Sequence, residues 1–184
     1  MAAAAKLFYA EGIRAVSLDA VADKAGVTKR TFYYHFTSKD ELVAATLEAR
    51  DQPNLALFQR WFEAAAGDVA AKTRSLFENL AASARHPKWK GCGFLRTSAE
   101  LVATPGHPAM VIAGAHKKRV EDWLRGVFEA DGIADPARLA RQVMLLMDGA
   151  FAAALLHRDA TYMEAAGEAA FVLVTGAMKA QKSR

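Results

Sequence analysis

Apolar residues recur at helical spacing along most of the chain, and short stretches with glycine, proline or capping residues interrupt them. In the first fifty residues this pattern predicts four short helices, at about residues 3–10, 18–25, 29–35 and from 39 onward. Ser17, Thr28 and Ser38 are typical N-caps, and Gly26 is a typical C-cap. The segment "SKDE" predicts a capping box completed by Glu41.

Longer helices are predicted beyond residue 50. Apolar residues at 55–62 extend the fourth helix or begin a new one, and further helices are expected at about 68–84, 107–131, 136–157 and 161–179. Asp135 followed by Pro136 is a typical helix start. The segments "HPKWKGCGF" and "TPGHP" contain the prolines and glycines typical of loops. The sequence therefore predicts an all-α protein.

The composition agrees with a folded helical protein. The chain has 184 residues, of which 53% are hydrophobic and only five are proline, so a real core can form and a disordered chain is excluded. The net charge of +4 permits a polyanionic partner without requiring one. The single cysteine, Cys92, excludes an internal disulfide and favours a reducing, cytoplasmic location.

Neither a signal peptide nor a membrane span is expected. Lys6 and Glu11 interrupt the apolar N-terminus where a continuous apolar region would run. The longest apolar run, at residues 143–156, contains Asp148 and is shorter than the roughly 20 residues that a spanning helix needs. We expect this run to be a buried helix.

The helix expected at 29–35 presents an unusual set of side chains. On a helical wheel Phe32 and Phe36 share one face and are the expected anchors to the core. The residues that point away or flank that arc are Lys29, Arg30, Thr31, Tyr33, Tyr34 and His35. Arginine can bind guanine in the major groove, a threonine methyl can meet thymine, and tyrosine or lysine can hold phosphates. The alternative is a solvated helix whose tyrosines cover the core by chance.

A family resemblance covers the same region. The segment "AKLFYAEGIRAVSLDAVADKAGVTKRTFYYHFTSKDELVAATL", residues 5–47, resembles the DNA-binding domain of the TetR family of transcriptional regulators. The matching motifs are "F-x-x-x-G", "A-x-x-A-G-V", "T-x-Y-x-H-F" and "S-K-x-x-L", at fixed separations. The resemblance is tight over about a quarter of the chain and extends to the remainder only by architecture. It implies a helix-turn-helix domain at residues 1–48 and a helical ligand-binding and dimerisation domain at 49–184.

The resemblance also implies roles for single residues. Tyr33 and Lys39 are the expected phosphate contacts. Ser17 and Thr28, at two helix N-termini, would also bind the phosphate backbone of the DNA. Arg30, Thr31 and Lys29 are the expected base contacts, and Tyr34 and His35 also approach DNA. Family members usually have a longer first helix preceded by a basic arm, so either the arm has been trimmed or this regulator lacks it. A minor-groove contact by such an arm is not expected.

The two C-terminal helices have broad apolar surfaces. The run at 143–156 is apolar nearly all round, and such a helix must be covered on every side. The resemblance implies that the last two helices pair with their copies in a homodimer, which would bind a near-palindromic operator through two half-sites. The alternative is the central helix of a monomeric bundle.

The resemblance further implies a pocket for a small apolar or aromatic effector. The residues expected to line it are Trp61, Phe62, Phe94, Trp123, Met147 and Phe151, with His116 or Asp148 as a polar orienting group. Each aromatic has the simpler alternative of plain core packing. No metal site or cofactor is expected.

An enzyme is not expected either. Cys92 has histidines elsewhere in the chain, yet no motif places a base and an orienting group beside it. The favoured function is a ligand-responsive transcriptional regulator, and repression is the favoured sign because a dimer on an operator blocks polymerase. The alternatives are a ligand-binding helical dimer that no longer binds DNA and a structural helical dimer without a ligand.

Overall fold

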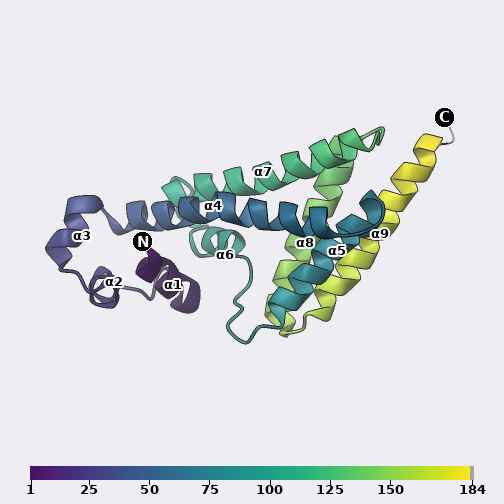
Figure 1. Cartoon of the computed structure of the whole chain (residues 1–184). Helices are drawn as coiled ribbons and strands as arrows, with labels where there is room; N and C mark the ends of the chain where they lie inside the picture. Colours follow the sequence, from purple (N-terminus) through teal and green to yellow (C-terminus); the bar gives the residue numbers. More distant parts are fainter. Residues whose placement is uncertain (183–184) are drawn as a thin grey trace. The chain divides into compact units, whose positions relative to one another are not determined.

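The computed structural model describes the backbone of residues 1–182 and the side chains of residues 1–180. Within this part the chain is all-helical, as predicted, and contains no strand (Figure 1). Its helices are α1 (Ala2–Glu11), α2 (Leu18–Ala25), α3 (Lys29–His35), α4 (Lys39–Ala64), α5 (Val69–Ala84), α6 (Gly93–Glu100), α7 (Pro108–Ala130), α8 (Pro136–His157) and α9 (Thr161–Lys182).

Helix α4 confirms one of the two alternatives left open for residues 55–62, an extension of the fourth helix, whereas helix α6 was not expected. Helix α4 runs without interruption through Pro53, although proline lacks the N–H that would bond to the carbonyl four residues earlier. Helix α6 was not predicted at all. Its first residue is Gly93, and its N-cap Cys92 makes no side-chain capping hydrogen bond, so the usual signals of a helix start are absent.

The chain forms two compact units, which we call the first and the second unit. The first contains Met1–Pro53 and Cys92–His116, and the second contains Asn54–Gly91 and the chain from Lys117 onward. Helices α4 and α7 therefore each contribute to both units. The boundary expected between residues 48 and 49 separates a DNA-binding from a ligand-binding domain, whereas the two units are defined by packing. The expected boundary therefore stays a prediction.

The core of the first unit joins the N-terminal helices to α6 and the start of α7. Ser17, Thr28 and Gly26 fix where α2 and α3 begin and end, and each helix then buries one apolar stripe. The buried side chains are Ala4, Phe8, Ile13, Val16, Val21, Phe32, Leu42, Val43, Ala44, Leu47, Phe94, Leu101, Ala109 and Ala113. Residues after 90 are thus part of the hydrophobic core that holds the N-terminal helices.

The second unit is built on the close packing of α5 against α9, which run side by side in Figure 1, with α8 also packed on α9. Phe77 of α5 is fully buried. A Cβ atom at Gly167 of α9 would lie 2.8 Å from the Phe77 Cβ, so only glycine allows the two helices this approach. The Asp68 and Asp135 side chains cap α5 and α8, accepting the N–H groups of Ala71 and Arg138.

Helix α8 is long and apolar enough to cross a membrane by length and composition alone. The core helix of a globular protein passes the same test, and 44% of its most apolar window is buried inside the protein. This helix begins with Pro136 in its first turn and ends at His157, followed by Arg158 in a left-handed conformation.

Candidate DNA-binding surface

Helices α2 and α3 are joined by a turn with the geometry of a helix-turn-helix. Ser17 Oγ accepts the N–H of Ala20 at 3.1 Å and starts α2. Gly26 ends it in the left-handed region, with φ 67° and ψ 32°, where side chains other than glycine are strained. The N–H of Val27 donates to the carbonyl of Ala22 at 3.0 Å, which completes the hydrogen-bond pattern of a Schellman motif.

The short helix α3 is held by one buried aromatic residue. The Phe32 side chain is 6% exposed, and its ring lies 5.6 Å from that of Phe36 between centroids. Thr28 Oγ1 accepts the N–H of Thr31 at 3.2 Å and caps the helix start. A seven-residue helix is not stable alone, so Phe32 and this cap are what keep α3 folded.

The predicted DNA-contacting side chains of α3 face the solvent. Tyr33 is 53% and Tyr34 86% exposed, although tyrosines usually cover apolar surface. The other residues of this group are exposed too, namely Lys29, Arg30, Thr31 and His35. We call these six residues the α3 surface. Ser17 and Thr28 are also exposed, and Lys39 at the start of α4 is half-buried.

One predicted base contact, Lys29, has a partner within the protein. Its Nζ lies 2.9 Å from Asp19 Oδ1 and 3.2 Å from Asp19 Oδ2 on α2. The hydrogen bond to Asp19 raises the pKa of Lys29 above its usual value, so the ammonium stays charged. The pair is exposed, and exposed ion pairs are weak, so a phosphate or a base can replace Asp19 as the partner of Lys29.

The start of α4 differs in detail from the predicted capping box. Ser38 Oγ accepts the Glu41 N–H at 3.1 Å, as expected. The Glu41 carboxylate, however, accepts the N–H of Thr37 at 2.6 Å and its hydroxyl at 2.7 Å, rather than bonding back to Ser38. These bonds to Thr37 lower the pKa of Glu41, because they favour the ionised carboxylate.

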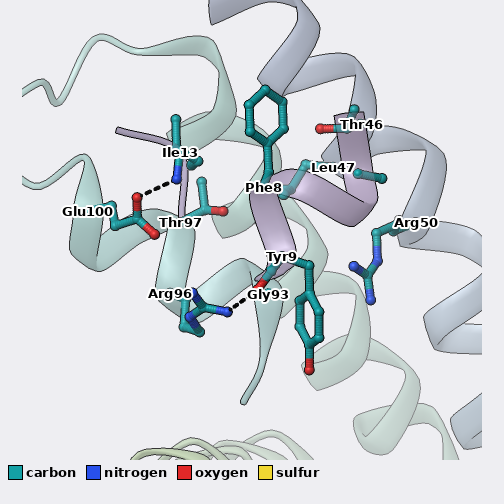
Figure 2. A pocket seen from close by; sticks show the side chains of 11 residues that line it. Phe8, Tyr9, Ile13, Thr46, Leu47, Arg50, Gly93, Arg96, Thr97 and Glu100 are labelled. Atoms are coloured by element: carbon teal, nitrogen blue, oxygen red, sulfur yellow. Dashed lines mark hydrogen bonds between the residues drawn. The ribbon is translucent and has the colours of Figure 1, made fainter. Parts of the chain in front are cut away.

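Two side chains of α6 hold the end of α1 in place (Figure 2). Arg96 Nη1 donates to the carbonyl of Tyr9 at 2.8 Å, and Glu100 Oε2 accepts the N–H of Ile13 at 2.7 Å. The carbonyl lies in the last turn of α1, where a cation is favourable, and the N–H begins the segment leading to α2. We call this pair of hydrogen bonds the α6 clamp.

Glycine is required where α1 meets this clamp. Gly12 adopts φ +90°, and a Cβ atom there would lie 3.2 Å from Glu100 Oε1. The guanidinium groups of Arg50 and Arg96 lie 5.2 Å and 5.6 Å from the Tyr9 ring centroid, in the range of cation–π contacts. The adjoining cavity has a volume of about 30 Å³, which suits a water molecule but not an effector.

The clamp residues were not singled out from the sequence. Arg96 and Glu100 are four residues apart, so on a helix they share one face, but α6 itself was not predicted. The signal that could have found them is the alternation of buried Phe94, Thr97 and Leu101 with these two charges. This spacing indicates an amphipathic helix with a polar pair beside its buried stripe.

The side chains predicted to line an effector pocket fall in both units. In the first unit the rings of Phe94 and His116 stack with centroids 3.6 Å apart, and His116 Nδ1 lies 2.7 Å from Asp51 Oδ1. His116 and Asp51 are both buried, so this hydrogen bond satisfies polar groups that burial would otherwise leave costly.

The other predicted lining residues lie in the second unit. The rings of Phe62 and Trp123 meet edge to face at 5.7 Å, and Met147 is buried. Asp148 forms an ion pair with Lys117, whose Nζ also lies 5.5 Å from the Phe151 ring centroid. The half-buried Trp61 has its ring 5.9 Å from that of Phe58. The cavity of about 30 Å³ beside α1 is lined by none of the eight predicted residues.

In the described part of the chain, no three His, Cys, Asp or Glu side chains come together in a way that could hold a metal ion. The half-buried Cys92 is the N-cap residue of α6.

Comparisons with known proteins match both the N-terminal helices and the whole fold. The family described as bacterial regulatory proteins, tetR family, matches residues 1–46. A structure described as a TetR transcriptional regulator from Streptomyces avermitilis is 31% identical, with a TM-score of 0.74 and coverage of 92% of this chain and 94% of that one. The chain belongs to the TetR family.

Further relatives agree with this membership. A TetR-family transcriptional regulator from Streptomyces coelicolor is 29% identical, with a TM-score of 0.79 and coverage of 98% of this chain and 92% of that one. The transcriptional regulator SrpR from Pseudomonas putida is 43% identical over 51 residues, which are 28% of this chain and 24% of SrpR. The match to such curated relatives thus spans well under half of their length.

The chain is therefore a DNA-binding transcriptional regulator of the TetR family. The helix-turn-helix described above lies within the residues that the family matches. Since TetR-family regulators are not enzymes, this membership also confirms the prediction that the chain has no catalytic function.

Proposed function

We propose that the protein represses transcription by binding a near-palindromic operator as a homodimer and leaves the DNA when a small apolar or aromatic effector binds. The observation that carries the DNA-binding part is the α3 surface, where two tyrosines and an arginine are exposed on a helix anchored by Phe32. Arg30, Thr31 and Lys29 would contact bases, while Tyr33 and Lys39 would hold phosphates. Ser17, Thr28, Tyr34 and His35 complete the proposed contacts.

The exposed apolar residues of α8 and α9 support a homodimer. On α8 the exposed positions 145, 149, 152 and 156 share one face, and on α9 positions 165, 169, 172 and 176 do so. None of these positions is charged, and the largest side chains among them are Leu145, Leu156 and Val172, which are 68%, 78% and 66% exposed. We call these two stripes the α8–α9 surface. Exposed apolar faces of this kind mark protein interfaces.

An effector site remains part of the proposal. Its lining would come from Trp61, Phe62, Phe94, Trp123, Met147 and Phe151, with His116 or Asp148 orienting the ligand. His116 is hydrogen-bonded to Asp51, and Asp148 is paired with Lys117. An effector would have to displace these partners or bind to the pairs as they are. The proposed location is the cytoplasm, where the operator DNA is.

The experiment that tests the DNA-binding part is fluorescence anisotropy on DNA from upstream of the protein's own gene, at two salt concentrations. Arg30→Ala and Tyr33→Ala should each weaken binding by roughly 1–3 kcal/mol, and wild-type binding should fall with salt. Arg60→Ala changes another exposed arginine, in the second unit; it is the matched control and should change the affinity little.

Two results would contradict the proposal. If both α3 variants bind as tightly as the wild type, the α3 surface does not contact DNA. If the wild type binds this DNA no better than random DNA, and thermal shift still detects apolar ligands, the alternative of a ligand-binding helical dimer is favoured.

A further inference from the structure

A second, larger cleft lies in the second unit. It has a volume of about 560 Å³, within the range usual for small-molecule sites. The end of α5 and the segment after it form one wall, and the end of α8 with the turn to α9 forms the other. It is lined by Ala84, Arg85, His86, Pro87, Trp89, Lys90, Ala154, Leu155, Arg158, Asp159 and Ala160. None of the residues proposed to bind DNA or effector belongs to this set.

Arg158 in this cleft has a backbone conformation that normally requires glycine. It follows α8 as the C-cap with φ 53° and ψ 39°. In the described part of the chain every other residue with positive φ is a glycine. Glycine is the usual residue at such a position, because a Cβ atom is strained there. Strain of this kind is typical of positions where the side chain has a function.

The charges around the cleft leave Arg158 without a protein partner. Arg85 forms an ion pair with Glu164, and the Asp159 carboxylate accepts the N–H of Thr161 at 2.9 Å, which holds it at the start of α9. Among the described residues, none accepts a hydrogen bond from the Arg158 side chain or forms an ion pair with it. With Arg85, Lys90 and Arg158 against Asp159, the lining has an excess of positive charge.

The remaining lining is suited to a flat apolar body. Trp89 is half-buried and Pro87, Ala154 and Leu155 add apolar surface. His86 Nδ1 accepts the N–H of Lys88 at 3.2 Å, so the neutral ring carries its proton on Nε2, which can donate to an oxygen. An apolar wall beside an arginine fork matches a ligand that joins an aromatic ring to a carboxylate.

We propose that this cleft binds small aromatic carboxylates, with the carboxylate on Arg158 and the ring against Trp89. Arginine binds carboxylates through two parallel hydrogen bonds, which explains why this residue occupies a position otherwise suited to glycine. The site is separate from the proposed effector lining and does not depend on DNA binding.

The test is isothermal titration of the full chain with 1-naphthoate. Arg158→Gly removes the guanidinium and places glycine where the backbone favours it, so the fold is retained and the thermal midpoint is expected to stay or rise. Binding of 1-naphthoate should weaken about 10- to 100-fold in this variant, as expected for losing charge-assisted hydrogen bonds. Arg138→Ala, an exposed arginine on α8 outside the cleft, should bind like the wild type.

A second, uncharged ligand separates the contribution of the carboxylate charge to the affinity from that of the apolar ring. Uncharged 1-naphthamide should bind wild type about tenfold or more weakly than 1-naphthoate, and Arg158→Gly should remove most of that difference. The proposal is overturned if 1-naphthoate does not bind the wild type, if Arg158→Gly binds it unchanged, or if both ligands bind equally. It is also overturned if Trp123→Ala abolishes binding while Arg158→Gly does not, because the ligand would then occupy the proposed effector lining.

Discussion

The α3 surface and the α8–α9 surface both expose large side chains, but their chemistry differs. On α3 the exposed aromatics carry hydroxyl groups and stand beside Arg30 and Lys29. On the α8–α9 surface the exposed side chains are aliphatic, and its two stripes contain no charge. A polar partner such as DNA suits the first, and an apolar partner such as a second copy suits the second. Several large side chains exposed on one helix face thus mark a candidate interaction surface, and the chemistry of that face indicates its partner.

The largest expected effect comes from a charge on the α8–α9 surface. Leu156→Asp should raise the dimer dissociation constant by about 100-fold or more, because a two-fold interface buries the unpaired carboxylate in both copies. Analytical ultracentrifugation measures this directly. Val111→Asp, at a similarly exposed valine on α7, is the control and should leave the assembly unchanged. If the Leu156→Asp variant remains as dimeric as the wild type, the α8–α9 surface does not form the interface.

A smaller effect is expected from the packing that holds α9. Gly167→Ala forces a methyl group against Phe77 and should lower the free energy of unfolding by about 1–3 kcal/mol. Gly126→Ala on α7 has no atom within 4 Å of the new Cβ and should raise it by up to about 1 kcal/mol. Urea denaturation compares the two. Equal results would show that α5 and α9 do not pack as closely as described.

The sequence was sufficient for the elements that carry local signals. Ser17 and Thr28 start α2 and α3 through side-chain hydrogen bonds, and Gly26 ends α2 through its left-handed backbone, so both helices were predicted where they lie. The buried position of Phe32 follows from helical spacing alone. Local chemistry thus determined both the helix-turn-helix and the exposed side of α3.

Features that depend on distant residues were not predictable in this way. Helix α6 lacks a capping side chain and is stabilised by burying Phe94 and Thr97, and the α6 clamp joins residues 87 positions apart in sequence. The partners of His116 and Asp148 likewise come from other helices. Periodicity indicates that such residues face inward but not which residues they meet.

The α6 clamp should affect the α3 surface at a distance. Glu100→Ala removes the acceptor for the Ile13 N–H and should weaken operator binding about tenfold, since α1 then positions α2 and α3 less firmly. The salt dependence should stay unchanged, because no phosphate contact is lost. Glu48→Ala on α4 removes the same charge from an exposed position and is the control in the anisotropy assay. Equal affinities of the two variants would contradict this role.

The smallest expected effect concerns pH. The hydrogen bonds from Thr37 lower the pKa of Glu41 below its ordinary value of 4.5, so their stabilisation is present above that value and is lost as the pH falls through the lowered pKa. Glu41→Gln should therefore be less stable than wild type at about pH 7, and the difference should be smaller at about pH 3. Urea denaturation at both pH values measures this. A difference that grows toward low pH would contradict it.

The discontinuity of the first unit has a consequence for how the protein is made. The first 53 residues leave the ribosome well before Cys92–His116, yet Phe94, Leu101 and Ala109 belong to the same hydrophobic core. The nascent helix-turn-helix must therefore wait, with part of its apolar surface uncovered, for almost forty residues of the second unit to be synthesised. A chain truncated after α4 would keep the α3 sequence but lack the residues that complete its support.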